Sequence, residues 1–358
     1  MKAGRKRNMS KKIALDATNL KMEERIAHTE YSMHYHTEYI KNITGIGEDT
    51  EERIRKFYNL WDYDFLWVVD DGLYGNWLER GRATDMGHAE YAIDGSDKSQ
   101  SKECPFKDVS DVYGFDPSEE YGLPDFKQQV SEYEKRYNER SRNFPGQLIT
   151  GGYYKTIISG AIQAFGWEML LLAASDKDKF EKVLDRFFNH TLFHMKAWAE
   201  TSAEVIIQHD DFVWSSGPFI SPEFYRKVII PRYAELWKVL KKRGKKVLFC
   251  SDGDFRIFAK DIVEAGADGL IFEPVNDFGF MAENFGDSVC LVGSFVDCRD
   301  MTFNRWEKVK GDIDKTVEYV KRGKCRGLIF AVGNHIPANV PDEMCDRYIN
   351  YLKEAIKR

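Results

Sequence analysis

The sequence predicts a single α/β domain, a (β/α)8 TIM barrel with a helical extension at its amino terminus. In the second half of the chain, short apolar runs alternate with helical stretches, and glycine stands where most of the helices end. Most of the apolar runs close on acidic or other polar side chains. No GxGxxG pattern follows the first strand, so this repeat fits a barrel of about 290 residues better than an open dinucleotide-binding sheet.

Apolar runs bounded by polar residues indicate the strands. Seven such runs are present, and an eighth is expected in the irregular part of the chain, because a barrel of this class needs eight. The seven cover residues 64–71, 146–150, 203–207, 246–250, 269–272, 289–293 and 327–331.

Helical spacing and capping residues predict the other elements. Residues 1–20 are basic and no apolar segment follows them, so we expect a disordered start and not a signal peptide. Residues 21–358 form the barrel domain. Its predicted helices cover residues 21–41, 48–60, 123–142, 159–174, 177–199, 222–243, 255–265, 278–285, 306–322 and 342–356.

Composition excludes several classes of protein. The net charge of −6 gives no basic face for nucleic acid. No apolar run is long enough to span a bilayer, so we expect no membrane segment. Six scattered cysteines without CxxC pairs fit reduced thiols, and we therefore expect a cytoplasmic protein.

Polar residues at the ends of the predicted strands are the first functional signal. In a TIM barrel the carboxyl ends of all strands meet at one mouth, so tips that are distant in sequence share one pocket. Polar tips on so many strands indicate an active site. They are Asp70/Asp71, Tyr153/Tyr154, His209/Asp210/Asp211, Asp252/Asp254, Glu273, Asp297 and Asn334/His335.

Residues 205–211, VIIQHDD, carry the densest of these tips. Side chains alternate along a strand, so His209 and Asp211 share one face. Gln208 and Asp210 share the other, and the apolar residues before them do not choose between the faces. Because the first residue beyond the strand lies over the pocket centre, we expect His209 to act with Asp210. The histidine is then a ligand or proton donor, and the carboxylate orients it or binds substrate.

Other histidines have plainer interpretations. His190 and His194 stand four apart on a predicted helix, a spacing that can hold a metal, but no third ligand lies near them in the sequence. We interpret them as helix-surface residues, and we interpret His28, His34 and His36 as surface or helix-packing residues.

Five segments carry a family resemblance: AEVIIQHDD, GPFISPEFYRKVIIPRY, KVLFCSDGD, GADGLIFEPVND and GNHIPANVPDEM. They resemble the uroporphyrinogen decarboxylase superfamily, and the resemblance extends from near Glu30 to the end of the chain. It implies a TIM barrel. The superfamily also contains zinc-dependent corrinoid methyltransferases, so the resemblance implies two activities and does not choose between them.

The decarboxylase branch has an Arg-rich signature near its amino terminus that grips the many carboxylates of its substrate. The matching region here, KMEERIAHTEYSMHYH, contains only Arg25. Asp70 or Asp71 matches the Asp that contacts pyrrole nitrogens in that branch, and His335 lies within one position of its late histidine. Decarboxylation of a tetrapyrrole or another carboxylate is therefore the second hypothesis.

The corrinoid methyltransferase branch binds zinc through a His-x-Cys pair and a Gly-Cys turn. This chain has Cys250-Ser251-Asp252 and Gly333-Asn334-His335 at those places, so the pattern with two thiolates is broken. A mixed set of nitrogen, oxygen and sulfur ligands would still accept zinc. The expected ligands are Cys250, Asp252, Glu273 and His335, with His209 also available.

The resemblance implies transfer of a methyl group to the cobalt of a corrinoid. No part of the chain looks like a cobalamin carrier, so we expect a separate corrinoid protein to bring the cobalamin. We expect an aryl methyl ether as donor (O-demethylation), because aromatic side chains crowd the strand ends. They are Trp67, Trp77, Tyr153, Tyr154, Phe212, Trp214 and Phe272. A barrel that binds a ligand without catalysis is the third hypothesis.

The strand ends supply the expected site residues. Ether cleavage leaves an oxygen that needs a proton or a Lewis acid, which acidic or imidazole groups at the mouth can provide. The expected catalytic residues are His209, Asp210, Asp252 and His335. The expected substrate-binding residues are Asp70, Asp71, Tyr153, Tyr154, Trp214, Phe272 and Asn334.

Overall fold

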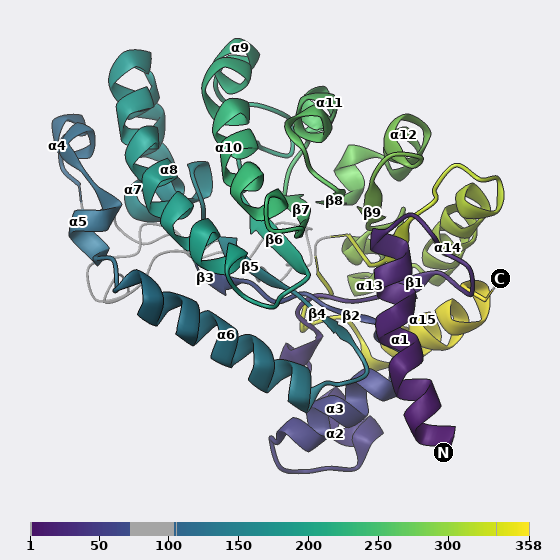
Figure 1. Ribbon diagram of the computed structural model, residues 1–358. Helices are drawn as coiled ribbons and strands as arrows, with labels where there is room; N and C mark the ends of the chain where they lie inside the picture. Colours follow the sequence, from purple (N-terminus) through teal and green to yellow (C-terminus); the bar gives the residue numbers. More distant parts are fainter. Residues whose placement is uncertain (1, 72–103, 105, 334, 358) are drawn as a thin grey trace.

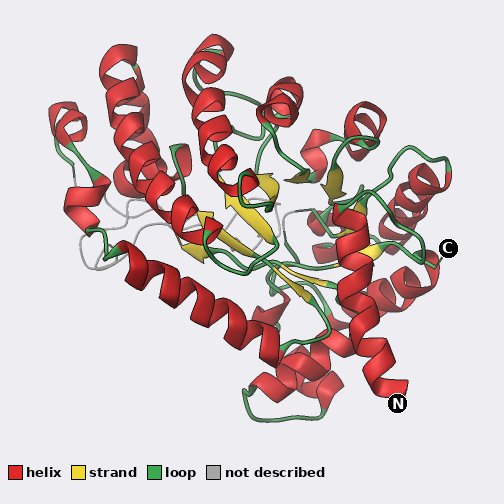
Figure 2. Cartoon of the chain, in the orientation of Figure 1, coloured by secondary structure: helices red, strands yellow, loops and turns green. Residues whose placement is uncertain are grey.

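The computed structural model describes residues 2–71, 104, 106–333 and 335–357 of the chain. Its strands run parallel around one ring with helices outside it (Figure 1, Figure 2). The second position of the ring is built from two short pieces, β2 and β3, and the third from β4 and β5. The strands are β1 (Ala27–His28), β2 (Phe65–Leu66), β3 (Asp70–Asp71), β4 (Leu148–Ile149), β5 (Gly151–Tyr154), β6 (Val205–His209), β7 (Lys246–Ser251), β8 (Gly269–Phe272), β9 (Cys290–Val292) and β10 (Leu328–Phe330).

The first and last strands close this ring. β1 pairs with β10, with Ala27 opposite Ile329. On its other side the backbone N–H of Asp64 donates to the carbonyl of His28 (2.9 Å), just before β2. The ring thus has eight strand positions, and the predicted (β/α)8 barrel is confirmed.

Helices surround the barrel in the predicted alternation, and those expected at 177–199 and 278–285 match the structure to the residue. The helix expected at 222–243 contains a π-helical turn, Tyr225–Ile229. No helix in the described residues is both long and apolar enough to cross a membrane. The α-helices are α1 (Lys2–Thr18), α2 (Thr37–Thr44), α3 (Glu51–Leu60), α4 (Val109–Gly114), α5 (Pro117–Tyr121), α6 (Phe126–Asn143), α7 (Ile158–Ala174), α8 (Lys177–Ala199), α9 (Pro222–Phe224), α10 (Ile230–Lys241), α11 (Arg256–Ala265), α12 (Phe278–Phe285), α13 (Cys298–Thr302), α14 (Trp306–Lys321) and α15 (Asp342–Ala355).

β1 is the eighth strand. The sequence predicts that strand in the irregular part of the chain, and this placement is wrong, as is the helix expected across 21–41, because β1 lies at Ala27–His28. Polar residues around β1 are paired, mostly with groups that lie far away in the sequence. Arg25 makes two bonds to the buried Asp64 (2.6 and 2.7 Å), and the ring of His28 bonds to Trp61 and Glu30. A polar segment therefore forms an inner strand because each buried polar group is paired.

The expectation of a disordered start at 1–20 is also wrong, because α1 occupies it. α1 packs against β1, β2, β4 and β10, and so covers strands from both sides of the closing seam. Its buried face includes Ile13, Ala14 and Ala17. Small residues let the helix approach the barrel closely: a Cβ added to Gly327 would lie 2.2 Å from the carbonyl oxygen of Ala17.

This close approach predicts a stability difference between two glycines. Gly327→Ala is expected to lower the free energy of unfolding by about 1–3 kcal/mol, since α1 would have to move away from the barrel. Gly311→Ala, in the interior of α14 with no atom within 4 Å of the added Cβ, is expected to raise it by up to about 1 kcal/mol. Urea unfolding of both variants measures the difference. Equal unfolding midpoints would contradict the tight packing of α1.

Candidate active site

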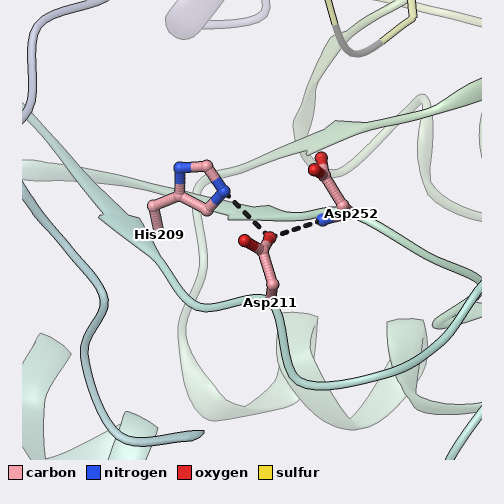
Figure 3. A group of neighbouring side chains, drawn as sticks. All are labelled: His209, Asp211 and Asp252. Carbon is pink, nitrogen blue, oxygen red and sulfur yellow. Dashed lines mark hydrogen bonds and ion pairs between the residues drawn. The ribbon is translucent and has the colours of Figure 1, made fainter. Parts of the chain in front are cut away.

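His209 and Asp211 form a bonded pair at the carboxyl end of β6. Nε2 of His209 lies 2.9 Å from Oδ1 of Asp211, and both residues are buried. The backbone N–H of Asp252, just after the neighbouring strand β7, donates to the same Oδ1 (2.9 Å). Figure 3 shows the side chains of His209, Asp211 and Asp252 around one space.

Asp210 points the other way. Its carboxylate accepts from the backbone N–H of Ser159 (2.6 Å) and Ile158 (3.2 Å) at the start of α7, and from the hydroxyl of Tyr233 (2.7 Å). It therefore caps a helix on the outer side of the strand. The expected pairing of His209 with Asp210 is wrong by one residue, because strand alternation places Asp211 on the face of His209.

Tyr154 completes this group from β5. Its ring stacks on His209 with centroids 3.9 Å apart, and its hydroxyl donates to Oδ2 of Asp211 (3.0 Å). Burial and the neighbouring charge of Asp211 raise the pKa of Tyr154 well above its ordinary value, so it stays a hydroxyl donor. Burial would also raise the pKa of Asp211, but the charge of His209 and the bonds it accepts lower it overall. Asp211 is thus an ionised acceptor at neutral pH.

Three side chains here could hold a metal ion. One ligand atom each from His209, Asp211 and Asp252 lies within 4.8 Å of the other two. Imidazole nitrogen and carboxylate oxygens are ordinary ligands for divalent transition metals.

The metal set expected from the sequence comes together only in part. Of its members, the described residues bring only Asp252 into a group of metal-binding geometry. Glu273 accepts from the backbone N–H of Gly253 (2.7 Å), and His335 is buried after β10. Burial raises the pKa of the Cys250 thiol well above its usual value, so without a metal it is not a thiolate.

The residues expected to bind substrate fall on two sides of the barrel wall. Asp70 bonds to Arg136 of α6 (2.7 Å), and Tyr153 stacks on His194 of α8 (4.4 Å), so both face the helices. Their expected role in substrate binding stays a prediction. The side chain of Asp71, and all of Asn334 and Trp77, lie outside the described residues.

An aromatic pocket opens beside Asp252 at the mouth. The ring of Tyr31 lies 4.7 Å from that of Trp67, and both line the pocket with Phe272 and Cys250. Phe212, by contrast, packs among aromatic rings of the helix layer. Trp214 is 40% exposed, on the loop after β6. Sequence reasoning missed Tyr31. This residue follows β1, so a prediction of that strand would have grouped Tyr31 with the other strand ends.

His190 and His194 are buried on α8. Nδ1 of His194 bonds to Tyr133 (2.8 Å), and Nδ1 of His190 to Ser118 (3.2 Å). They belong to no group of three possible metal ligands among the described residues. The interpretation as helix-surface residues is wrong, because both side chains are buried. Burial lowers the pKa of His190 to about 4 and that of His194 to about 2, so both are neutral.

These neutral histidines predict acid sensitivity. His190 has a pKa of about 4 when folded and about 6.5 when unfolded, so between those values only the unfolded chain binds the proton. Its contribution is complete above about pH 6.5 and falls by about 1.4 kcal/mol per pH unit toward pH 4. His190→Asn, which keeps a polar partner for Ser118, should flatten this slope in urea unfolding measured at several pH values. An unchanged slope would show that the ring is not buried neutral.

Comparisons with known proteins agree with this fold. Residues 158–355, more than half of the chain, match the family model described as uroporphyrinogen decarboxylase (URO-D). No curated protein sequence gives a significant match.

Solved structures give a broader likeness. A methyltransferase from Methanosarcina mazei has a TM-score of 0.64 at 17% identity, over 96% of this chain and 98% of that one. At that identity the likeness is one of fold. D-psicose 3-epimerase with D-tagatose from Clostridium cellulolyticum H10 scores 0.39 at 11% identity, over 65% of this chain and 93% of that one. A xylose isomerase-like TIM barrel protein from Mycobacterium smegmatis scores 0.34 at 12% identity, over 75% and 94%.

Proposed function

Because the chain belongs to the uroporphyrinogen decarboxylase family, we propose that it is the methyltransferase of a corrinoid-dependent O-demethylase. It takes a methyl group from an aryl methyl ether and transfers it to the cobalt of a separate corrinoid protein. The observation that carries the proposal is a buried group of hydrogen-bonding and acidic side chains, His209, Asp211 and Tyr154, beside an aromatic pocket.

The side chains that line the pocket have the chemistry to contact a donor ring. Trp67 and Tyr31 offer aromatic faces for stacking, and Phe272 adds apolar surface. Nε1 of Trp67 is buried and has no hydrogen-bond partner among the described residues. A buried N–H of this kind is a ready donor to an ether oxygen or another polar group on the ring.

The polar group suits the leaving oxygen. When the bond between methyl carbon and oxygen breaks, the methyl group passes to the cobalt and the oxygen keeps the electron pair. That oxygen then needs a proton or a positive charge close by. The His209–Asp211 pair can carry the proton, with Tyr154 holding the carboxylate in place.

The partner would dock at the mouth. Large apolar side chains are exposed on the segments that follow β6, β7 and β8, all at the carboxyl ends of the strands. They are Trp214 (40% exposed), Ile257 (49%), Val275 (36%) and Phe280 (37%). Exposed apolar residues gathered on one face are typical of a protein-binding surface. We refer to these four residues as the apolar rim.

Decarboxylation of a tetrapyrrole is less well supported. Arg25, the lone arginine of the signature region, lies just before β1 and is bound by both carboxylate oxygens of Asp64. That is the amino-terminal end of the strand, opposite the mouth. It therefore cannot grip substrate carboxylates at the site described above.

Methyl transfer to free cob(I)alamin tests the proposal. The purified protein is mixed with cob(I)alamin and each of a panel of methoxylated aromatics, and the change in the corrinoid absorption spectrum is followed. Methylation with at least one donor is expected, together with release of the corresponding phenol. No CO2 release from uroporphyrinogen is expected. Ligand binding without methylation would favour the non-catalytic barrel, and CO2 release would favour the decarboxylase.

The apolar rim predicts a selective defect. Ile257→Glu is expected to raise KM for a corrinoid protein about 10-fold or more, since it puts a charge into the contact (roughly 1.4 kcal/mol or more). The rate with free cob(I)alamin should stay unchanged. Leu60→Glu is the matched control, because Leu60 is similarly exposed (39%) but ends α3 on the far side of the barrel. Equal KM values for the two variants would place the docking surface elsewhere.

A further inference from the structure

We propose that a second cavity, next to the aromatic pocket, binds the carboxylate of a small aromatic acid. The cavity has a volume of about 180 Å³. Its walls come from the segments that follow β1 and surround β2, and from the helices α3 and α6 (Figure 1). Tyr31 and Trp67 line both this cavity and the aromatic pocket. The binding site itself stands without the proposed function, which enters only where the source of the acid is considered.

Arg140 of α6 brings a positive charge to the cavity. Within the part of the chain that the structure describes, its guanidinium has no ion pair and no hydrogen bond. Burial lowers the pKa of Arg140, against the charge of Asp70, but the group stays charged at neutral pH. Asp70 itself bonds to Arg136, one turn earlier on α6 (2.7 Å). A cation that is partly buried without a close anion favours an anionic ligand.

Two tyrosine hydroxyls add hydrogen-bond donors. The hydroxyl of Tyr63 is buried and has no hydrogen-bond partner among the described residues. The ring of Tyr58 lies 4.7 Å from that of Tyr63, and the charge of Arg140 acts on it. Burial raises the pKa of Tyr58 to about 12 and that of Tyr63 well above its ordinary value, so both stay protonated. A carboxylate oxygen beside Arg140 would give the hydroxyl of Tyr63 the acceptor that it lacks.

Glu30 is an acidic side chain in the same lining, and its bonds are already made. Its oxygens accept from the backbone N–H of Val332 (2.9 Å) and the hydroxyl of Tyr348, and one of them lies 3.1 Å from Nε2 of His28. These groups offset its charge. The guanidinium of Arg140 and the hydroxyl of Tyr63 therefore remain for a ligand.

The apolar walls set the size of the ligand. The rings of Tyr58 and Phe144 lie 5.4 Å apart, and Leu66 and Ile149, opposite each other on β2 and β4, add aliphatic surface. An apolar cavity of about 150 Å³ holds one benzene ring. Sites for drug-sized ligands begin at about 300 Å³, so a tetrapyrrole is far too large. A single ring that carries one carboxylate matches both the volume and the lining.

Two sources carry this chemistry. The first is the methyl donor itself, with its carboxylate on Arg140 and its ring beside Tyr31 and Trp67. The second is a separate aromatic acid that binds here while the donor occupies the mouth. The first source rests on the proposed function, and the second does not.

Calorimetric titration with benzoate tests the inference, because benzoate has the ring and the carboxylate but no methyl ether. The wild type is expected to bind one molecule per chain. Benzyl alcohol, which has the same ring without the charge, should bind at least about 10-fold more weakly. This comparison uses only the wild type, so it stays decisive if a variant fails to fold. No binding of benzoate, or equal affinity for the two compounds, would overturn the site.

Variants assign the binding to the named residues. Arg140→Gln should weaken benzoate binding by about 10-fold or more, because it removes the charge that the carboxylate meets. Tyr63→Phe, which removes one hydroxyl, should weaken it by about 2- to 10-fold. Arg142→Gln is the matched control, because Arg142 lies on the same helix but is exposed. Equal affinity in Arg140→Gln and Arg142→Gln would also overturn the site.

Kinetics with two donors separate the sources. If the acid is the methyl donor, Arg140→Gln raises KM for a methoxybenzoate about 10-fold and leaves KM for methoxybenzene unchanged. If the acid is a separate ligand, both KM values stay unchanged while benzoate binding is lost. Benzoate binding that depends on Arg140, without methyl transfer from any donor, would leave the site standing and remove the proposed function. Methyl transfer without benzoate binding would do the reverse.

Discussion

Asp211→Asn is expected to lower the rate of methyl transfer by about 100-fold or more, the usual scale for losing a group that supports acid–base or metal chemistry. Asp211 accepts hydrogen bonds from Nε2 of His209, the backbone N–H of Asp252 and the hydroxyl of Tyr154. Asparagine keeps the shape of the side chain. Its N–H₂ group, however, replaces one acceptor oxygen at a place where only hydrogen-bond donors face it. The ring of His209 then loses its fixed position. The rate with free cob(I)alamin measures this effect without a contribution from docking.

Asp210→Asn is the matched comparison. It replaces the same carboxylate oxygen with an amide nitrogen in the preceding residue, which is also buried. Its carboxylate caps α7 and accepts from Tyr233. We expect a loss of about 1–3 kcal/mol in the free energy of unfolding and a rate per folded molecule within a few fold of the wild type. A larger rate loss in Asp210→Asn than in Asp211→Asn would restore the pairing that the sequence first indicated.

Glu30→Gln is expected to lower the free energy of unfolding by about 3–5 kcal/mol, as for other broken buried ion pairs. Glu30 accepts from the backbone N–H of Val332 (2.9 Å), the hydroxyl of Tyr348 and Nε2 of His28 (3.1 Å). Nδ1 of His28 lies 2.9 Å from the carbonyl of Trp61, so both ring nitrogens face acceptors. In either orientation of its amide, the N–H₂ group of a glutamine would face at least one of these three hydrogen-bond donors.

Urea unfolding at neutral pH measures this effect, with Glu24→Gln as control because Glu24 is exposed on the same segment. A cycle with His28→Asn isolates the ion pair, and we expect the double variant to lose less than the sum of the two single losses. Equal unfolding midpoints for Glu30→Gln and Glu24→Gln would show that the pair contributes nothing.

The barrel could be predicted because most of its strands have a recognisable local sequence pattern. The runs at 246–250 and 269–272 are apolar, short and followed by polar tips, and they correspond to β7 and β8. β1 could not be recognised in this way. Its His28 is bonded to Glu30 and to the carbonyl of Trp61, and the second of these partners lies 33 residues away, outside any local pattern.

The candidate site shows the same limit. Alternation along β6 correctly grouped His209 with Asp211, but the choice between the two faces depended on what lies behind the strand. The start of α7 and the hydroxyl of Tyr233 take up Asp210. These groups are 51 and 23 residues away in the sequence. Only the fold places them there, so the choice of aspartate required the structure.

The seam between β1 and β10 has a consequence for how the chain folds. Ala27 pairs with Ile329, so the ring cannot close until about 300 residues after β1 have been synthesised. Until then the edges of both strands and the apolar face of α1 lack their final partners. Contacts between such distant residues form slowly, and uncovered strand edges favour aggregation. Newly made chains are therefore most prone to aggregate before β10 has been synthesised and paired, and expression at low temperature or with chaperones should raise the soluble yield.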